Sequence, residues 1–86
     1  MMTNDGWLDA QLAASYLAGD RSALGLIYDH CGQSLFDTAT AMTNSRDDAS
    51  DMVQDVFVLA AERLGQLRDP SRLEPWLFAI LRNEVY

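Results

Sequence analysis

A long apolar stripe between Leu24 and Met42 constrains the fold of this chain more than any other feature of its sequence. Successive members are separated by 3, 1, 3, 4, 4 and 3 positions, which keeps them on one face of an α-helix for about five turns. No segment alternates apolar and polar residues in the way that a half-buried strand requires. The sequence therefore predicts an all-α fold built on this stripe, whose members are Leu24, Ile27, Tyr28, Cys31, Leu35, Ala39 and Met42.

Two further helices are predicted on either side of this one. The first covers about residues 5–18, because apolar residues recur there at i+4 and Gly19 is suited to end a helix. Asp20 can then accept from the next unpaired backbone N–H groups. The third helix runs to about residue 64 and begins after Ser45, which forms a capping-box-like pair with Asp48.

A fourth helix is predicted to begin near Leu73, because Pro75 is tolerated in a first turn and apolar residues follow at helical spacing. Asp69 and Pro70 indicate a turn or a short helix just before it. The pattern is still helical when the chain stops at Tyr86, without a Gly or Pro as a stop signal. We predict a compact bundle of four helices that forms one domain over residues 1–86.

The charge balance excludes one class of function. The chain carries 13 acidic and 6 basic side chains, all of them arginine, for a formal net charge of −7. Domains that bind DNA independently of its sequence need positive charge to neutralise the phosphates, so this acidic composition excludes such a domain. It favours instead a partner with a basic surface. No run approaches the roughly 20 apolar residues that span a bilayer, and the N-terminus lacks the basic segment of a signal peptide. With one cysteine, which cannot form an internal disulfide, the sequence predicts a cytoplasmic protein that does not bind membranes.

The residues give little support to an enzyme. The only histidine, His30, adjoins the only cysteine, Cys31, and neighbours on a helix point about 100° apart. They are therefore not expected to form a nucleophile with its base. Cys31 is interpreted as a small buried apolar residue of the stripe, and His30 as a solvent-facing residue. No catalytic residue and no cofactor is predicted.

Acidic residues form a second stripe on the third predicted helix. Asp47, Asp51 and Asp55 recur at i+4, and Gln54 and Glu62 extend the polar surface. A calcium-binding loop would need ligands at alternate positions and a central glycine, so no metal site is predicted here. Two interpretations remain open, a solvated acidic face and a docking surface for a basic partner.

Trp76, Ile80 and Asn83 share one face of the last predicted helix because they are spaced by 4 and 3 residues. Trp76 and Ile80 can be ordinary core residues. Alternatively, Asn83 and the preceding loop, with Leu67 and Arg68, form a small pocket in which an amide reads the edge of an unstacked base. The residues alone leave both interpretations open.

Three motifs in a fixed order resemble a known family. Residues 48–57, DASDMVQDVF, resemble the run A-x-D-x-V-Q-x-x-F, and residues 76–83, WLFAILRN, are similar to W-L-x-x-I-A-x-N. Residues 19–24, GDRSAL, with Tyr28, are similar to the opening G-D-x-x-A-[FL]-x-x-L-[FY]. Over about residues 8–86, the chain resembles region 2 of the extracytoplasmic-function (group IV) sigma factors of the sigma-70 family.

The resemblance implies a non-enzymatic role in transcription initiation. Such domains dock on the clamp helices of the RNA polymerase β-prime subunit and capture the melted non-template strand of the promoter −10 element. Anti-sigma factors commonly grip the same domain, so a regulatory partner of that kind is also implied. Matched by position, the polymerase-docking residues are Asp51, Gln54, Asp55 and Phe57, and the DNA-binding residues are Leu67, Arg68, Trp76, Arg82 and Asn83.

The chain departs from the family pattern at three places. Leu67 stands where an aromatic residue is common, and Leu81 replaces a small alanine before Arg82. The arginine-rich turns that follow in the family, and the second domain that reads the −35 element, do not appear after Tyr86. The sequence is therefore expected to be an N-terminal fragment that binds promoters poorly by itself.

Two other classes of protein compete with this interpretation. One is a plain helical interaction domain without a link to polymerase. The other is an acidic four-helix carrier of the acyl-carrier type, which needs a serine in an Asp-Ser-Leu context at a helix N-terminus. Here Ser34 follows Gln33 in the middle of a predicted helix, which argues against a carrier.

Overall fold

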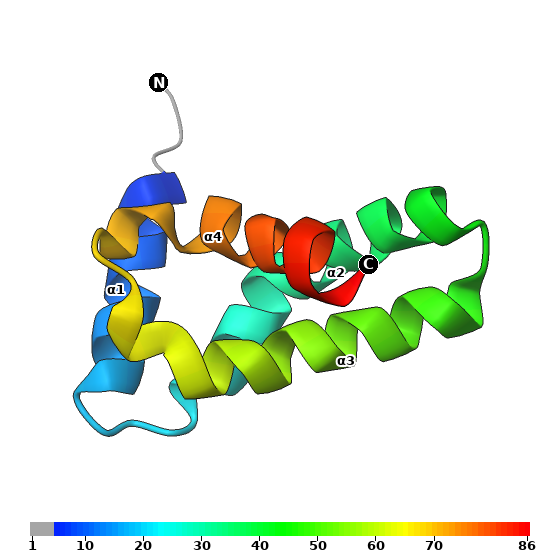
Figure 1. Ribbon diagram of the computed structural model, residues 1–86. Helices are drawn as coiled ribbons and strands as arrows, with labels where there is room; N and C mark the ends of the chain where they lie inside the picture. The colour runs from blue at the N-terminus through cyan, green and yellow to red at the C-terminus, as the bar shows by residue number, and fades with distance from the viewer. Residues whose placement is uncertain (1–4) are drawn as a thin grey trace.

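The computed structural model describes residues 5–86, and these form helices joined by short turns, with no strand among them (Figure 1). A π-helical turn, Leu81–Val85, continues the last helix. The all-α prediction and the four predicted helices are confirmed. The helices are α1 (Asp5–Leu17), α2 (Ala23–Thr43), α3 (Arg46–Arg63) and α4 (Leu73–Ile80).

The two longest helices, α2 and α3, form a hairpin, with α1 across one end and α4 returning along it (Figure 1). The hairpin turn is closed by Asn44, which has the left-handed φ of 56° and donates its N–H to the carbonyl of Thr40 at 2.7 Å. Ser45 then caps α3, because its hydroxyl accepts from the N–H of Asp48 at 3.2 Å. The predicted cap is confirmed.

The turn between α1 and α2 also follows the expectation. Gly19 has a φ of 107°, a value that side chains disfavour, so a glycine ends α1 there. The carboxylate of Asp20 accepts from the N–H of Ser22 at 3.1 Å, and α2 begins at Ala23. None of the described helices is long and apolar enough to cross a bilayer.

The core lies between the inner faces of α2, α3 and α4, with Ala13 added from α1. One member of the predicted α2 stripe differs, because Tyr28 is 52% exposed. Its ring packs edge-on against Phe57, and Gly32 one turn later leaves room for it, since a Cβ there would lie 3.3 Å from the ring. The buried apolar residues of the bundle are Ile27, Cys31, Leu35, Ala39, Ala49, Val53, Val56, Phe57, Ala60, Leu64, Leu73, Leu77, Ile80 and Leu81.

The structure changes the predicted form of the last helix. It is α-helical only to Ile80 and then widens into the π-helical turn, which closes through the Tyr86 N–H to the Leu81 carbonyl at 2.9 Å. Leu81, the residue that departs from the small alanine of the family pattern, is fully buried. The tyrosine hydroxyl of Tyr86 donates to the carbonyl of Met42 at 3.2 Å and ties this end to the α2–α3 turn.

Candidate functional site

The outer face of α3 is acidic. The carboxylates of Asp47, Asp51, Asp55 and Glu62 are all exposed, as is the amide of Gln54. Within residues 5–86 no arginine forms an ion pair with these acids. The i+4 spacing predicted from the sequence therefore produces a row of exposed carboxylates that form no ion pair with an arginine among the described residues.

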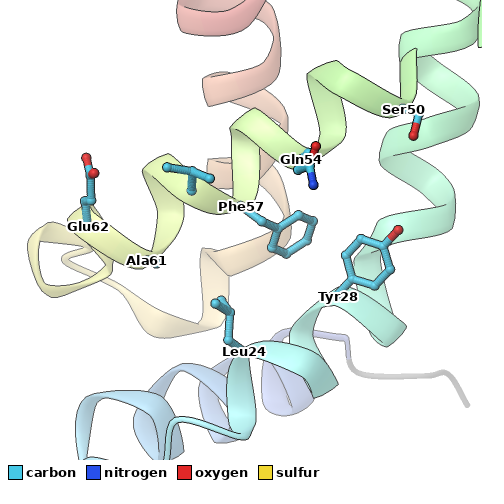
Figure 2. Close-up of a pocket in the computed structure, with 8 residues that line it drawn as sticks. Leu24, Tyr28, Ser50, Gln54, Phe57, Ala61 and Glu62 are labelled. Carbon is cyan, nitrogen blue, oxygen red and sulfur yellow. The ribbon is translucent and has the colours of Figure 1, made fainter. Parts of the chain in front are cut away.

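A groove of about 630 Å³ lies beside this face, between α2 and α3 (Figure 2). Phe57 forms part of it and is only 8% exposed, with its ring centroid 5.1 Å from that of Tyr28 at an angle of 63°. Tyr28 and Val58 are each more than half exposed at the groove, which makes it apolar and accessible. The residues that line it are Leu24, Tyr28, Ser50, Gln54, Phe57, Val58, Ala61 and Glu62.

Three of the four docking residues predicted from the sequence are exposed, and the fourth, Phe57, is buried. Asp51 and Asp55 are exposed on α3 and do not line the groove, whereas Gln54 is exposed and does line it. Phe57 belongs to the core, is 8% exposed and also lines the groove. Its ring packs against that of Tyr28, which is the more exposed of the two.

A second surface forms around the half-buried Trp76. On one side, its indole lines a hollow of about 190 Å³ together with Ile80 and Asn83, which lie on one face as their spacing predicts. On the other side, it lines a hollow of about 330 Å³ together with Leu67 and Arg68. Three of the other four residues predicted to bind DNA thus lie beside the indole of Trp76, in two hollows instead of one pocket. Arg82, the fifth, is exposed and lines neither hollow.

The loop that carries Leu67 and Arg68 is held by a local cap. Asp69 accepts from the backbone N–H of Ser71 at 3.1 Å and from its hydroxyl at 2.7 Å, at the start of the 3₁₀ turn Pro70–Arg72. The hydrogen bonds from Ser71, with a smaller contribution from the charge of Arg72, hold the pKa of Asp69 below its ordinary value of 3.8. The 3₁₀ turn Pro70–Arg72 confirms the turn or short helix predicted at Asp69 and Pro70.

An ion pair forms between two residues that line the smaller hollow. Nη1 of Arg63, in the last turn of α3, lies 3.3 Å from the carboxylate of Glu84. Both residues line the hollow with Asn83, so a negative charge stands beside the amide and offsets the guanidinium. Sequence reasoning missed this pair, because 21 residues separate its members and no short-range spacing rule connects them.

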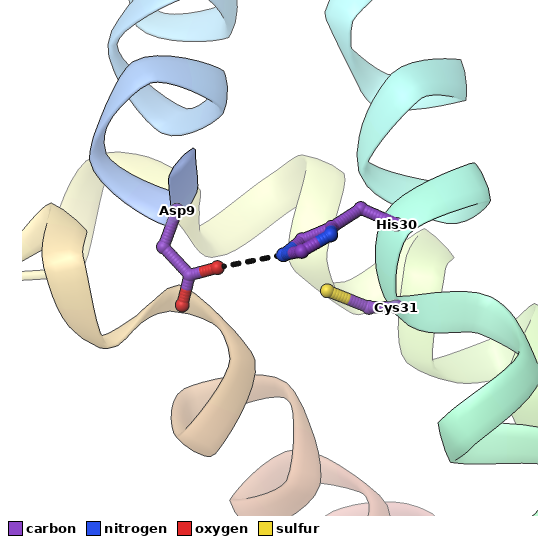
Figure 3. A group of neighbouring side chains, drawn as sticks. All are labelled: Asp9, His30 and Cys31. Carbon is purple, nitrogen blue, oxygen red and sulfur yellow. Dashed lines mark hydrogen bonds and ion pairs between the residues drawn. The ribbon is translucent and has the colours of Figure 1, made fainter. Parts of the chain in front are cut away.

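Sequence reasoning also missed Asp9, the one buried acid among the described residues, which is 2% exposed. Its Oδ1 lies 3.1 Å from Nε2 of His30 on α2, and its Oδ2 accepts from the N–H of Glu74 at 2.9 Å (Figure 3). The expectation that His30 faces solvent is wrong, because α1 covers it and leaves its side chain 20% exposed. The interpretation of Cys31 as a buried residue is confirmed.

Asp9 acts as a cap supplied from another helix. The residue that precedes α4, Arg72, makes no side-chain cap, and the N–H groups of a first helical turn have no partners within the helix. The carboxylate of Asp9 satisfies one of them and places negative charge at the positive end of the helix. The start of the helix that carries Trp76 is thereby fixed by α1.

Comparison with known proteins shows the family to which this chain belongs. Residues 27–86 match the family described as Sigma-70 region 2. The chain therefore belongs to the sigma-70 family, as a region 2 domain of the extracytoplasmic-function type.

Individual relatives agree with this assignment. The chain is 36% identical over 66 residues, 77% of its length, to a protein named probable RNA polymerase sigma factor RfaY from Xanthomonas campestris pv. campestris. It is 31% identical over 81 residues, 94% of its length, to RNA polymerase sigma factor NccH from Alcaligenes xylosoxydans xylosoxydans. It is 31% identical over 75 residues, 87% of its length, to ECF RNA polymerase sigma factor SigM from Mycobacterium tuberculosis.

These matches cover 16%, 44% and 38% of the three relatives, so the chain spans less than half of the length of each. No solved structure matches the chain significantly.

Proposed function

We propose that this domain docks on the clamp helices of the RNA polymerase β-prime subunit through the acidic face of α3 and the groove beside it. The observation that carries the proposal is the row of exposed, uncompensated carboxylates next to an accessible apolar groove. A basic helix laid along α3 would relieve the repulsion between like charges at i+4. Apolar side chains of the same helix would fill the groove against Tyr28 and Val58.

The two parts of this surface have different expected effects. Exposed carboxylates steer a basic partner and make association depend on salt. The groove contributes apolar area that leaves water on binding and so determines how long the complex lasts. Gln54 lies at the boundary between the two, where its amide can bond to a backbone or side-chain group of the partner.

The test is the affinity of the chain for purified core RNA polymerase at two salt concentrations. Asp51→Arg is expected to weaken binding at least tenfold, because it places a positive charge against a basic partner. Asp37→Arg makes the same change of charge at an exposed position of α2 outside the groove and is expected to bind almost as the unchanged chain does. If both variants lose the same affinity for polymerase, the effect is one of net charge alone. If both keep the affinity of the unchanged chain, docking through α3 is refuted.

We propose further that the surface around Trp76 holds an unstacked base of the melted −10 element. The indole and the aliphatic side chain of Leu67 provide apolar walls, and the amide of Asn83 offers two donors and an acceptor to a base edge. Arg68 and Arg72 line the larger hollow and are suited to phosphates. Arg82, exposed outside both hollows, is also suited to a phosphate contact.

These roles differ in their dependence on sequence. In a complex of the chain with core polymerase, Asn83→Ala is expected to change the preferred base of a single-stranded −10 oligonucleotide, by about 1–3 kcal/mol of discrimination. Arg82→Ala is expected to weaken the binding of all these oligonucleotides by a similar factor, whatever their base sequence. An unchanged base preference in Asn83→Ala would refute the assignment of the reading amide.

An anti-sigma factor is a further proposed partner, and the groove between α2 and α3 is where we expect it to bind. Occupation of the groove would prevent polymerase from using the same surface. Such a factor is expected to compete with core polymerase for the chain, and simultaneous binding of both would contradict a shared surface. A plain interaction domain remains the alternative if the folded chain does not bind polymerase at low salt.

A further inference from the structure

A carboxylate, an imidazole and a thiol converge where α1 packs on α2 (Figure 3). One donor atom from each of Asp9, His30 and Cys31 lies within 4.8 Å of the other two. Asp9 is 2% exposed, Cys31 is fully buried and the side chain of His30 is 20% exposed. We propose that this cluster is a binding site for a zinc ion, independent of the polymerase and promoter surfaces.

The donor set is the first argument. Zinc is held in proteins by cysteine sulfur, histidine nitrogen and carboxylate oxygen, in tetrahedral geometry with bonds of about 2.0–2.3 Å. Oxygen and nitrogen ligands at these lengths are separated by about 3.3 Å across a tetrahedral angle. Oδ1 of Asp9 and Nε2 of His30 already lie 3.1 Å apart. The sulfur of Cys31 lies within 4.8 Å of a donor atom of each of these residues, so it moves closer to them to complete three ligands, and water takes the fourth position.

The second argument is the support of the carboxylate. Oδ2 of Asp9 is held by the N–H of Glu74 at 2.9 Å, so the carboxylate has a fixed orientation and presents Oδ1 toward His30. Hydrogen bonds of this kind orient the ligands in established zinc sites. The support comes from the backbone of α4, which means that bound zinc would connect α1, α2 and the start of α4.

Charge balance is the third argument. When zinc binds, the thiol of Cys31 loses its proton to solvent, and His30 binds as the neutral imidazole with its proton on Nδ1. The thiolate and the carboxylate then carry two negative charges against the two positive charges of the ion, so the buried site is neutral. Burying a neutral assembly avoids the desolvation penalty of an isolated charge. The imidazole of His30 is the part of the cluster that solvent reaches, since its side chain is 20% exposed.

The sequence predicted no metal site, because that prediction depended only on the spacing of residues along one helix. Asp9 is 21 residues from His30, and only the packing of α1 on α2 brings their side chains together. Two simpler outcomes compete with the proposed zinc site. The cluster can be an Asp9–His30 hydrogen bond beside an ordinary core cysteine, or zinc can associate only with the acidic face of α3.

The experiment titrates the metal-free chain with Co²⁺ as a spectroscopic probe and then with Zn²⁺. We expect one ion per chain, a thiolate-to-cobalt charge-transfer band that Zn²⁺ removes, and protection of Cys31 from a thiol reagent. With zinc at a hundredfold excess over its Kd, the Tm is expected to rise by about 15 °C. Absence of the band, or of a rise in Tm at millimolar metal, would overturn the proposal.

Matched variants separate the outcomes. Cys31→Ala leaves the Asp9–His30 hydrogen bond in place and is expected to abolish the band and the rise in Tm. His30→Gln keeps a hydrogen-bond donor for Asp9, removes the ligand nitrogen, and gives a second test should Cys31→Ala not fold. Asp51→Asn, on the acidic face, is expected to bind zinc unchanged. A rise in Tm that survives Cys31→Ala would show that the thiol is not a ligand and refute the site. A rise that is lost in Asp51→Asn would place the zinc on the surface of α3 and refute it as well.

Discussion

Replacing Asp9 by alanine tests whether one residue of α1 determines where α4 begins. The carboxylate is almost fully buried and makes two hydrogen bonds, to the N–H of Glu74 at 2.9 Å and to Nε2 of His30 at 3.1 Å. Alanine removes both acceptors and leaves no other cap for the first turn of α4, since Arg72 makes none. The variant therefore removes a connection among three helices with a single change.

The magnitude follows from these two bonds. A hydrogen bond to a charged group is worth about 1.5–3 kcal/mol, and a buried donor left without a partner costs about 1–3 kcal/mol. Removal of the buried charge also removes its desolvation penalty, which offsets part of the loss. We expect Asp9→Ala to lower the free energy of unfolding by about 3 kcal/mol. For a domain of this size, that corresponds to a fall in Tm of about 15 °C.

The assay is urea and thermal unfolding followed by circular dichroism, with chelator present so that metal has no influence. Asp29→Ala, which removes an exposed acid from α2, is the matched control and is expected to stay within about 0.5 kcal/mol of the unchanged chain. Asp9→Asn keeps an acceptor for the Glu74 N–H and is expected to lose about half as much as alanine. A loss below about 1 kcal/mol in Asp9→Ala would refute the role of Asp9 as a cap.

Three more changes have expected outcomes that simple measurements check. Gly25→Ala adds a Cβ that meets nothing within 4 Å, so urea unfolding should show a gain of about 0.5–1 kcal/mol, and a loss would contradict the open space at that position. Glu84→Gln releases Arg63 from its ion pair, so single-stranded −10 DNA should bind the chain–polymerase complex up to about fivefold more tightly; weaker binding would show that the pair assists DNA binding. The pKa of Asp69 is lowered by its bonds from Ser71, so its stabilising contribution is complete above pH 3.8 and is lost as pH falls through the lower folded value. The Ser71 amide signal in NMR should therefore titrate below pH 3.8, and a midpoint at or above that pH would contradict the cap.

Local rules were sufficient for most of the helices. The stripe from Leu24 to Met42 predicted α2, and the pairing of Ser45 with Asp48 predicted the start of α3, because both signals depend only on neighbours within one or two turns. The end of α1 at Gly19 was equally predictable, because a positive φ depends on the single residue that adopts it. The widening of the last helix after Ile80 has no such local signal, and the sequence predicted only that the chain stays helical.

Contacts between distant segments could not be predicted in the same way. Asp9 caps α4 across 65 residues, and α1 covers His30, which helical periodicity alone assigned to solvent. For the candidate site, the spacing of Trp76 and Asn83 predicted a shared face, and the structure adds Arg63 from α3 and its ion-pair partner Glu84. The roles assigned to these residues and to the acidic face of α3 remain predictions.

The most direct test of the central claim asks which surface of the chain touches polymerase. A photoreactive phenylalanine analogue is placed at Val58, which is 55% exposed and lines the groove, or at Leu26, which is 52% exposed on α2 and does not line it. After irradiation with core RNA polymerase, the proposal predicts a crosslink from position 58 to the β-prime clamp helices and little from position 26. Efficient crosslinking from position 26 with none from position 58, in chains that bind polymerase equally well, would contradict docking through the face formed by α3 and its groove.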